Sequence, residues 1–421
     1  MSTDVNASII TIGDELLIGQ TIDTNSAFIA TALNKIGVWM KRRVAVGDVR
    51  DEILDALKDE SSRSQIVIIT GGLGPTADDI TKPALCDYFG STLVTNNDVL
   101  EHVKNLFARI KRPLLQSSVT QADVPDNCTV LPNRRGTAPG MWFEKDGVVY
   151  ISLPGVPHEM EGLMEAEVIP KLQQHFSFPH IIHKTLVTFG RGESEIAEMI
   201  SSFEQALPTN IKLAYLPAYG MVKLRLTGKD SNKEPLEEAM ETQTASLKKL
   251  VAEWLVTEGD KPLSEVVGEL LKASKKFVAT AESCTGGYIA HLLTKRSGSS
   301  STYRGGVVSY ANDAKERALN VQHSTLVTHG AVSEETIIEM ANGVLKNLNA
   351  DYAIATSGVM GPEGGTSQKP VGTVWIAVAD RSRVKTVKHF VRFDRKKNIE
   401  VTAQFALNLL RIFIKEQEGI D

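Results

Sequence analysis

Ser283 lies in the segment TAESCTGG, residues 280–287, where a predicted strand turns into a helix that begins near Thr285. A serine at such a turn faces helix N–H donors, which can stabilise an oxyanion. It needs a base, and the next predicted strand ends at Tyr310 and is followed by Lys315. A lysine desolvated near a tyrosine can deprotonate a serine directly or through the phenol. These residues predict a nucleophile with an activating pair.

Each of these residues also has a simpler interpretation. Cys284 is a rival nucleophile, and a thiol is intrinsically stronger than a hydroxyl. Neighbouring side chains point in different directions, so only one of Ser283 and Cys284 is expected to face the pocket. Tyr310 alone would be a packed aromatic, and Lys315 alone a solvated helix charge. If Ser283 is only a helix cap, the case for covalent catalysis is lost.

A long loop rich in glycine and proline occupies residues 356–374, TSGVMGPEGGTSQKPVGTV, between two predicted strands. Loops of this length are usually functional. The alternative is a structural Ω-loop. Four polar side chains in it are candidates for holding an anionic ligand: Ser357, Thr366, Lys369 and Thr373.

A second glycine-rich segment, GGLGPTADD at 71–79, follows a buried strand and precedes a helix. Glycines permit close backbone approach, and the amides of such a loop form a phosphate cradle. Asp78 and Asp79 then place carboxylates where a divalent ion could bridge to phosphate oxygens. The alternative is a tight turn with an aspartate helix cap. The three glycines are Gly71, Gly72 and Gly74.

Two further predicted strands deliver acids at their ends. Asp14 and Glu15 follow the first strand, and LPGVPHEM at 153–160 supplies Glu159. The carboxyl ends of parallel strands are where α/β sheets bind ligands, so a shared crevice is predicted. Individually, each acid is more often a cap or a surface charge. The histidines show no metal spacing such as HExxH.

Strands and helices alternate over residues 7–172, from a β-branched strand at 7–13 onward, which is typical of a doubly wound α/β domain. Residues 173–256 indicate a small α+β unit, and TEGDKPLS at 257–264 indicates a linker. The α/β pattern returns from residue 262. We therefore expect three domains, 1–172, 173–256 and 257–421. The first helix has an apolar face at Ile22, Ile29, Leu33 and Ile36.

Composition sets further bounds. The chain has 421 residues, 42% hydrophobic and 23% charged, which excludes a mostly disordered, collagenous or coiled-coil chain. Its net charge of −5 gives no chain-wide cation for nucleic acid. No apolar run is long enough to span a membrane, and the first residues lack a basic signal region. Three cysteines without a CxxC pair fit a reducing, cytoplasmic compartment.

Taken together, these motifs make the whole chain similar to the CinA family, the competence/damage-inducible protein A type. GDELLIGQTIDTN, GGLGPTADD and LPGVPHEM resemble the molybdopterin-binding, MoaB/MogA-like fold. The middle unit resembles the KH-type insert of the family. AESCTGG, SYANDAK and GPEGGTSQKPVGTVW resemble nicotinamide mononucleotide deamidases.

The resemblance implies two activities. The C-terminal domain would convert nicotinamide mononucleotide to nicotinic acid mononucleotide and ammonia without a cofactor, with Ser283 as nucleophile and Tyr310 and Lys315 as the activating pair. Its substrate-binding set would be Thr285, Gly286, Gly287, Ser357, Gly358, Gly364, Gly365, Thr366, Lys369 and Thr373.

The N-terminal domain would hydrolyse ADP-ribose to AMP and ribose 5-phosphate. It would use a divalent ion held by Asp78 and Asp79, with Mg²⁺, Mn²⁺, Co²⁺ and Ni²⁺ all compatible and K⁺ as an optional further cation. The family also implies a homodimer. The nucleotide-binding set would be Asp14, Glu15, Asn25, Gly71, Gly72, Gly74, Thr76, Gly155 and Glu159.

Two other functions stay open. The N-terminal domain could bind a molybdopterin-like ligand without hydrolysis, because fold does not fix function. Alternatively, the chain could be an accessory protein of DNA uptake or repair, although nucleic acid and membranes are not expected partners. The Ser283, Tyr310 and Lys315 set argues against molybdopterin binding as a full account, and the charge of −5 argues against DNA.

Overall fold

The computed structural model describes residues 5–76, 78–218 and 220–420, so residue 77 of the segment GGLGPTADD lies outside the described residues. The chain forms two compact units. One comprises the chain up to Ile182 together with Gly228–Met240, and the other comprises His183–Thr227 together with the chain from Glu241 onward. None of the described helices is both long and apolar enough to cross a membrane.

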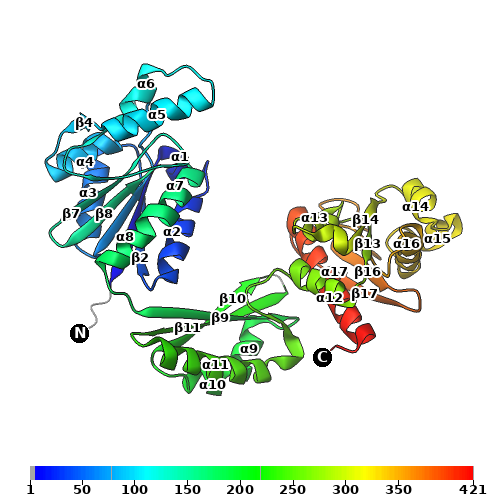
Figure 1. Ribbon diagram of the computed structural model, residues 1–421. Coiled ribbons are helices and arrows are strands. Elements are labelled where there is room, and N and C mark those ends of the chain that lie inside the picture. Colours follow the sequence, from blue (N-terminus) through cyan, green and yellow to red (C-terminus); the bar gives the residue numbers. More distant parts are fainter. Residues whose placement is uncertain (1–4, 77, 219, 421) are drawn as a thin grey trace. The chain divides into compact units, whose positions relative to one another are not determined.

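The first sheet has six strands and carries helices on both faces (Figure 1). Its first four strands in spatial order are parallel, and the fifth runs antiparallel to both of its neighbours. The two faces are covered by different helices because successive strand residues point to opposite sides. In spatial order the strands are β2 (Trp39–Val46), β1 (Asn6–Ile12), β3 (Ile66–Thr70), β8 (Val148–Leu153), β7 (Gly140–Lys145) and β6 (Thr129–Leu131).

One face of this sheet packs on α2 (Thr24–Lys35), α7 (Pro157–Leu163) and α8 (Ile169–His175), and the other packs on α3 (Arg50–Ser61) and α4 (Thr81–Phe89). The apolar face predicted for the first helix is wrong at one position, because α2 begins at Thr24 and Ile22 is 83% exposed. Further elements of the domain are α1 (Asp14–Leu17), β4 (Leu93–Thr95), α5 (Asn97–Arg109), α6 (Gln116–Val119) and β5 (Asp123–Pro125).

The second sheet has the strand order β10-β11-β9-β12. Strand β12 pairs with β9, so the segment predicted as a linker at 257–264 begins inside a strand. The α12 helix begins at Leu263, which leaves only residues 259–262 to connect them. The elements are β9 (His180–Phe189), α9 (Glu193–Met199), α10 (Ser201–Gln205), β10 (Ile211–Ala218), β11 (Met221–Asp230), α11 (Lys233–Leu250) and β12 (Leu255–Glu258).

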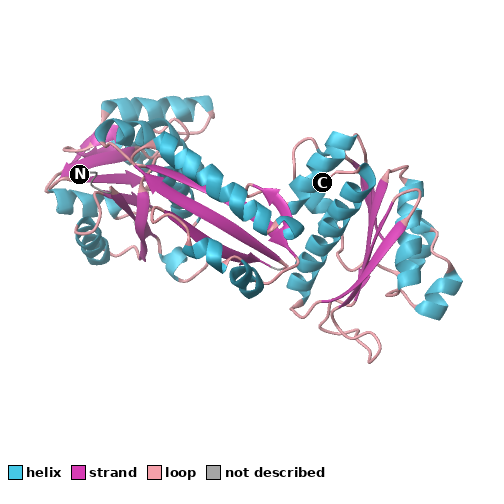
Figure 2. Ribbon diagram, turned by 90° about the horizontal axis from the view of Figure 1, so that it is seen from below, coloured by secondary structure: helices cyan, strands magenta, loops and turns pink. Residues whose placement is uncertain are grey.

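The third sheet has the order β14-β13-β15-β16-β17, with helices on both sides (Figure 2). Strands β14, β13 and β15 are parallel, whereas β16 runs antiparallel to both β15 and β17. Strands β13, β14, β15 and β17 therefore end at the same edge of the sheet. Their bounds are Val278–Glu282 (β13), Tyr303–Val308 (β14), Tyr352–Gly358 (β15), Thr373–Ala379 (β16) and Val384–Phe390 (β17).

Small and branched side chains divide the two faces of this sheet. Alanines of β13, β15 and β16 allow close packing of one group of helices, and larger aliphatic residues of the same strands pack on the other group. The first group is α14 (Asn312–Leu319), α15 (His323–His329) and α16 (Glu334–Asn347). The second is α12 (Leu263–Ser274), α13 (Tyr288–Thr294) and α17 (Arg395–Glu418).

Candidate functional sites

The structure brings Ser283 and Lys315 together at the edge where β13 and β14 end. The Lys315 Nζ donates to the Ser283 Oγ over 3.0 Å, although the two residues are 32 positions apart. Lys315 is only 1% exposed and Ser283 is 8% exposed. Lys315 is therefore not a solvated helix charge, which was the simpler interpretation of its sequence position. The contact places an amine where it can take the proton of the serine hydroxyl.

The surroundings of Lys315 favour its neutral form. Burial lowers the pKa of its ammonium group. No ion pair of Lys315 with a carboxylate occurs among the described residues to oppose that effect. Its Nζ also donates to the backbone carbonyls of Ser309, at 2.7 Å, and Tyr310, at 3.3 Å. The ammonium form has three hydrogens for Ser283 and the two carbonyls. In the neutral amine the two carbonyls can keep the two remaining hydrogens, so its lone pair faces Ser283 and accepts the hydroxyl hydrogen.

Cys284 is the weaker of the two candidate nucleophiles. It is buried, and it belongs to the hydrophobic core between the sheet and α12, α13 and α17. Burial raises the pKa of its thiol to about 12. A thiol that keeps its proton in apolar surroundings is a poor nucleophile. Ser283, in contact with Lys315, is therefore the nucleophile that the geometry supports.

The helix after Ser283 begins later than predicted, at Tyr288 rather than near Thr285. Several of its first N–H groups are not available to an oxyanion, because the carboxylate of Glu282 accepts them. Its oxygens accept the N–H groups of Gly287, Ile289 and Ala290 at 2.8–3.1 Å. The expected role of the helix terminus as an oxyanion site is therefore wrong for these amides. Sequence reasoning missed Glu282, because in the sequence it is only the last residue of a predicted strand.

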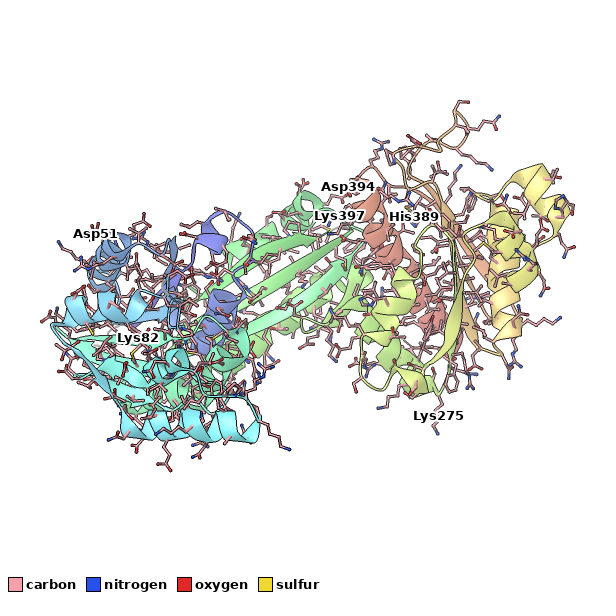
Figure 3. The ribbon with its side chains drawn as sticks, turned by 90° about the horizontal axis from the view of Figure 1, so that it is seen from above. Asp51, Lys82, Lys275, His389, Asp394 and Lys397 are labelled. Atoms are coloured by element: carbon pink, nitrogen blue, oxygen red, sulfur yellow. The ribbon has the colours of Figure 1, made fainter. Side chains whose placement is uncertain are left out.

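The backbone carbonyl of Tyr310 accepts a hydrogen bond from Lys315, and its phenol accepts one from an arginine. The Arg395 Nη2 donates to the Tyr310 Oη over 2.7 Å, and its Nη1 donates to the carbonyl of Gly361 over 2.8 Å. The Tyr310 side chain is 61% exposed, so it is not the packed aromatic of the simpler interpretation. Arg395 is the first residue of α17, directly after its N-cap Asp394, which is labelled in Figure 3.

Sequence reasoning missed Arg395 because it lies far along the chain in a charged stretch, FDRKKN. Only the fold reveals its position, since α17 begins just after the end of β17 at the same sheet edge. The guanidinium group bridges the tyrosine and the glycine-rich loop.

The long loop is partly tied to the segment between α15 and α16. The Ser357 Oγ donates to the carbonyl of Ala331 over 2.7 Å, and the Lys369 Nζ donates to that of His329 over 2.6 Å. Thr366 and Lys369 hydrogen bond to each other through their backbones. Thr373 is buried. These contacts give Ser357 and Lys369 a structural role in shaping the loop.

Thr285 is similarly engaged inside the protein. Its Oγ1 donates to the Glu282 carboxylate over 2.7 Å and lies 2.7 Å from the Thr356 Oγ1. The predicted glycines are required for different reasons. Gly286, Gly287 and Gly364 adopt positive φ, a backbone conformation that favours glycine. A Cβ at Gly358 or Gly365 would lie 2.7–2.8 Å from backbone atoms, so close packing excludes larger residues there.

In the N-terminal domain, four of the predicted residues line one cavity of about 110 Å³ at the ends of β1 and β3. The Asn25 Nδ2 donates to the carbonyl of Gly155 over 2.8 Å, which ties α2 to the end of β8. Gly71 has a φ of 115°, and a Cβ there would lie 2.2 Å from the Ile12 carbonyl oxygen. The four residues are Glu15, Asn25, Gly71 and Gly155.

Asp79 shapes the glycine-rich loop. Its carboxylate accepts the N–H of Gly74 at 2.8 Å and the N–H and hydroxyl of Thr76 at 2.9 and 2.5 Å. A Cβ at Gly74 would collide with that carboxylate, and one at Gly72 would collide with Thr81. Asp79 thus stabilises a tight turn, as in the alternative interpretation, but it is not the helix cap, because the N-cap of α4 is Ile80, with no side-chain cap hydrogen bond. Both of its oxygens accept hydrogen bonds from the loop, which gives Asp79 a structural role in this conformation.

Asp78 is different, because it is exposed and lies among other carboxylates. The Thr76 hydroxyl lowers the pKa of Asp78. Burial, followed by repulsion from Asp14, Glu15 and Asp78, raises the pKa of Asp48. No group of three acidic, histidine or cysteine side chains in the described residues is arranged to hold a metal ion.

Glu159 does not line this cavity. The Asn133 Nδ2 donates to its Oε2 over 2.6 Å, and a Cβ at Gly136 would collide with its carboxylate. Burial raises the pKa of Glu159. Sequence reasoning missed the contribution of the segment NRRGTAPG at 133–140, although its two glycines and its proline are a signal for a specific backbone path.

Three family models match successive parts of the chain. Residues 8–174 match the "Probable molybdopterin binding domain", residues 183–256 match the damage-inducible protein CinA KH domain, and residues 260–414 match the CinA C-terminal domain. The CinA-like protein of Cytophaga hutchinsonii is 50% identical over 416 residues, covering 99% of this chain and 100% of that protein. The chain belongs to the CinA-like family.

A second relative in the family, the CinA-like protein of Flavobacterium psychrophilum, is 45% identical over 96% of this chain and 98% of its own length. Among solved structures, the competence/damage inducible protein CihA from Agrobacterium tumefaciens is 39% identical, covering 36% of this chain and 93% of that chain, with a TM-score of 0.36. The predicted fold class is confirmed: a MoaB/MogA-like domain, a KH-like unit and a CinA C-terminal domain.

Proposed function

We propose that the C-terminal domain hydrolyses the amide of nicotinamide mononucleotide, releasing nicotinic acid mononucleotide and ammonia. The observation that carries the proposal is the 3.0 Å contact between Ser283 and the buried Lys315. An amine without an ion-pair partner among the described residues, held by two carbonyls, is a suitable general base for a serine hydroxyl.

The reaction runs in two stages. The Ser283 Oγ attacks the amide carbon while Lys315 takes its proton, and the resulting ammonium protonates the departing nitrogen, which leaves as ammonia. Water then attacks the acyl-serine ester and transfers a proton to Lys315. The ester bond breaks, Ser283 regains its proton, and the carboxylic acid is released. No metal or organic cofactor takes part in this sequence.

In this proposal a positively charged side chain, that of Arg395, binds the substrate. The phosphate of a mononucleotide is anionic, and Arg395 presents its guanidinium at the rim of the site beside Tyr310. Arginine matches phosphate geometry through paired N–H donors. Tyr310 then positions Arg395 and closes one side of the site, in addition to offering its carbonyl to Lys315.

The experiment is ammonia release from nicotinamide mononucleotide by the purified full chain. We expect steady turnover that is insensitive to EDTA and that Ser283→Ala abolishes. Absence of ammonia release under conditions where the chain is folded would refute the proposal.

The N-terminal cavity supports a second candidate activity, divalent-ion-dependent hydrolysis of ADP-ribose to AMP and ribose 5-phosphate. It is supported by the glycine loop, the cavity lined by Glu15, Asn25, Gly71 and Gly155, and the exposed Asp78 among other acids. Asp78 and Asp14 would hold the ion, which neutralises phosphate oxygens. If the domain only binds a molybdopterin-like or nucleotide ligand, AMP will not appear with any divalent ion.

Two broader expectations belong to the same proposal. A cytoplasmic location supplies both nucleotides, and three unpaired cysteines fit its reducing conditions. A homodimer is expected from the family. Light scattering of the full chain tests the second expectation directly.

A further inference from the structure

The strongest polar cluster that catalysis leaves unexplained is centred on the carboxylate of Glu282. This residue is 1% exposed, and a buried carboxylate is costly unless its oxygens are satisfied. Four donors satisfy it. Its Oε2 accepts from the Thr285 hydroxyl and the N–H groups of Gly287 and Ile289, and its Oε1 accepts the N–H of Ala290.

These donors all come from residues 285–290, which follow Glu282 directly in the chain. The turn that carries Ser283 and the first residues of α13 therefore wrap around the carboxylate. The negative charge also lies at the N-terminus of α13, the positive end of the helix dipole, and this stabilises both the carboxylate and the helix. Because Gly286 and Gly287 adopt positive φ, the turn has a specific shape that the carboxylate holds from inside.

The backbone of Glu282 reaches the other half of the catalytic pair. Its carbonyl accepts the N–H of Ser309, and the Ser309 carbonyl in turn accepts the Lys315 Nζ. The N–H of Ser283 donates to the carbonyl of Thr356 on β15. Glu282 thus contacts, through its two ends, the segments that position the serine hydroxyl and the lysine amine.

We propose that Glu282 is a positioning residue for the deamidase: its buried carboxylate sets the 283–287 turn so that the Ser283 hydroxyl faces the amine of Lys315. The inference rests on the proposed function for its reaction, but the geometry it explains is independent of the substrate. It predicts that loss of the carboxylate slows attack by Ser283 in a protein that is still folded.

The test uses Glu282→Gln in the full chain. Glutamine keeps the size and one acceptor oxygen, but it places an amide donor against the N–H of a helix residue. Two rates are measured: deamidation of nicotinamide mononucleotide, and covalent labelling of Ser283 by a fluorophosphonate, followed by mass spectrometry. We expect both labelling and kcat to fall about 10- to 100-fold, the scale of a misplaced catalytic group, with KM changed less than about twofold.

A matched control separates positioning from stability. Tyr352→Phe removes a partly buried hydrogen bond at the opposite end of β15, from the Tyr352 Oη to Glu418 at the end of α17. It should lower the melting temperature comparably and leave labelling of Ser283 unchanged. Wild-type labelling in a folded Glu282→Gln variant, or equal loss in the control, would overturn the inference.

If Glu282→Gln does not fold, a second pair of variants tests the inference. Thr285→Val removes one donor to the carboxylate and should slow labelling, whereas Thr285→Ser keeps the hydroxyl and should restore it. Equal labelling by these two variants would also overturn the inference. Labelling of Ser283 in wild type without ammonia release would refute the proposed deamidation instead, while the effect of Glu282 could still be measured.

Discussion

The Lys315 amine donates to the Ser283 hydroxyl over 3.0 Å from a position that is almost fully buried. The lysine comes from α14 and the serine from the turn after β13, so only the parallel pairing of β13 and β14 brings them together. The two side chains depend on each other: a buried amine without an acid partner needs acceptors, and the serine hydroxyl needs a base.

The first prediction concerns pH. Burial lowers the pKa of Lys315, and only the unprotonated amine can accept the serine proton. Values of kcat/KM for deamidation should therefore rise with pH up to the pKa of Lys315 and then level off. Lys315→Arg keeps a positive charge that cannot be lost in this range, so activity should fall about 10³-fold or more. A flat pH profile in wild type would contradict the assignment of the base.

The second prediction separates the two adjacent nucleophile candidates. Ser283→Ala should abolish ammonia release, because no other hydroxyl contacts Lys315 in the described residues. Cys284→Ala should retain most of the activity, since its thiol is buried and its pKa is raised to about 12. Cys284→Ala also leaves a small cavity, so the melting temperature is measured alongside. The reverse pattern of activities would make the cysteine the nucleophile.

The third prediction concerns Arg395 and Tyr310. Arg395→Lys keeps the charge but loses the paired donors that reach Tyr310 and Gly361. It should raise KM for nicotinamide mononucleotide about 10-fold with a smaller change in kcat. Tyr310→Phe removes only the phenol, and a direct proton relay through it would instead lower kcat about 10²-fold or more. A KM effect alone would identify Tyr310 as a positioning residue.

How much of this was predictable from sequence depends on the distance over which each signal acts. Strand and helix patterns are local, so the alternation over 7–172 and the β13 turn could be predicted. Ser283 and Lys315 could be proposed together because a strand end precedes each of them. Arg395 could not, because its neighbourhood with Tyr310 arises only when α17 follows β17 to the shared sheet edge.

The mistaken predictions have a common cause. The onset of α13 and the use of its N–H groups are decided by the Glu282 carboxylate, a tertiary contact with no periodic signature. For Asp79 the sequence predicts a metal ligand from residue type alone, and the structure adds that its oxygens accept hydrogen bonds from Gly74 and Thr76. A carboxylate at a turn has several possible partners, and only the backbone path selects one.

The fourth prediction concerns Lys82, a buried residue of α4 that is labelled in Figure 3. Its Nζ donates to the carbonyl of Gln121 over 3.0 Å, and burial lowers its pKa to about 8. Between pH 8 and about 10.5 the unfolded chain binds the proton that the folded chain has lost, so the free energy of unfolding should rise with pH. The slope from this site is at most about 1.4 kcal/mol per pH unit.

Lys82→Met removes this titration and provides the control. Amide hydrogen exchange of α4, corrected for intrinsic exchange rates, should show protection that increases from pH 8 to 10 in wild type relative to Lys82→Met. Identical profiles for the two proteins would show that the amine is not buried in solution.

The last prediction separates the two aspartates of the glycine loop. Asp79 accepts three hydrogen bonds from Gly74 and Thr76, so Asp79→Ala should distort the loop. Binding of ADP-ribose, measured by calorimetry, should then weaken both in EDTA and in Mg²⁺. Asp78 is exposed, and in the proposed function it holds the cation together with Asp14. Asp78→Ala should therefore leave binding in EDTA unchanged, while hydrolysis in Mg²⁺ falls about 10²-fold, the scale of losing a positioned electrostatic group.

Deamidation by both variants is the control and should match wild type, because its residues lie on another domain. If the two variants weaken binding equally in EDTA, the two aspartates share one structural role and the metal is held elsewhere.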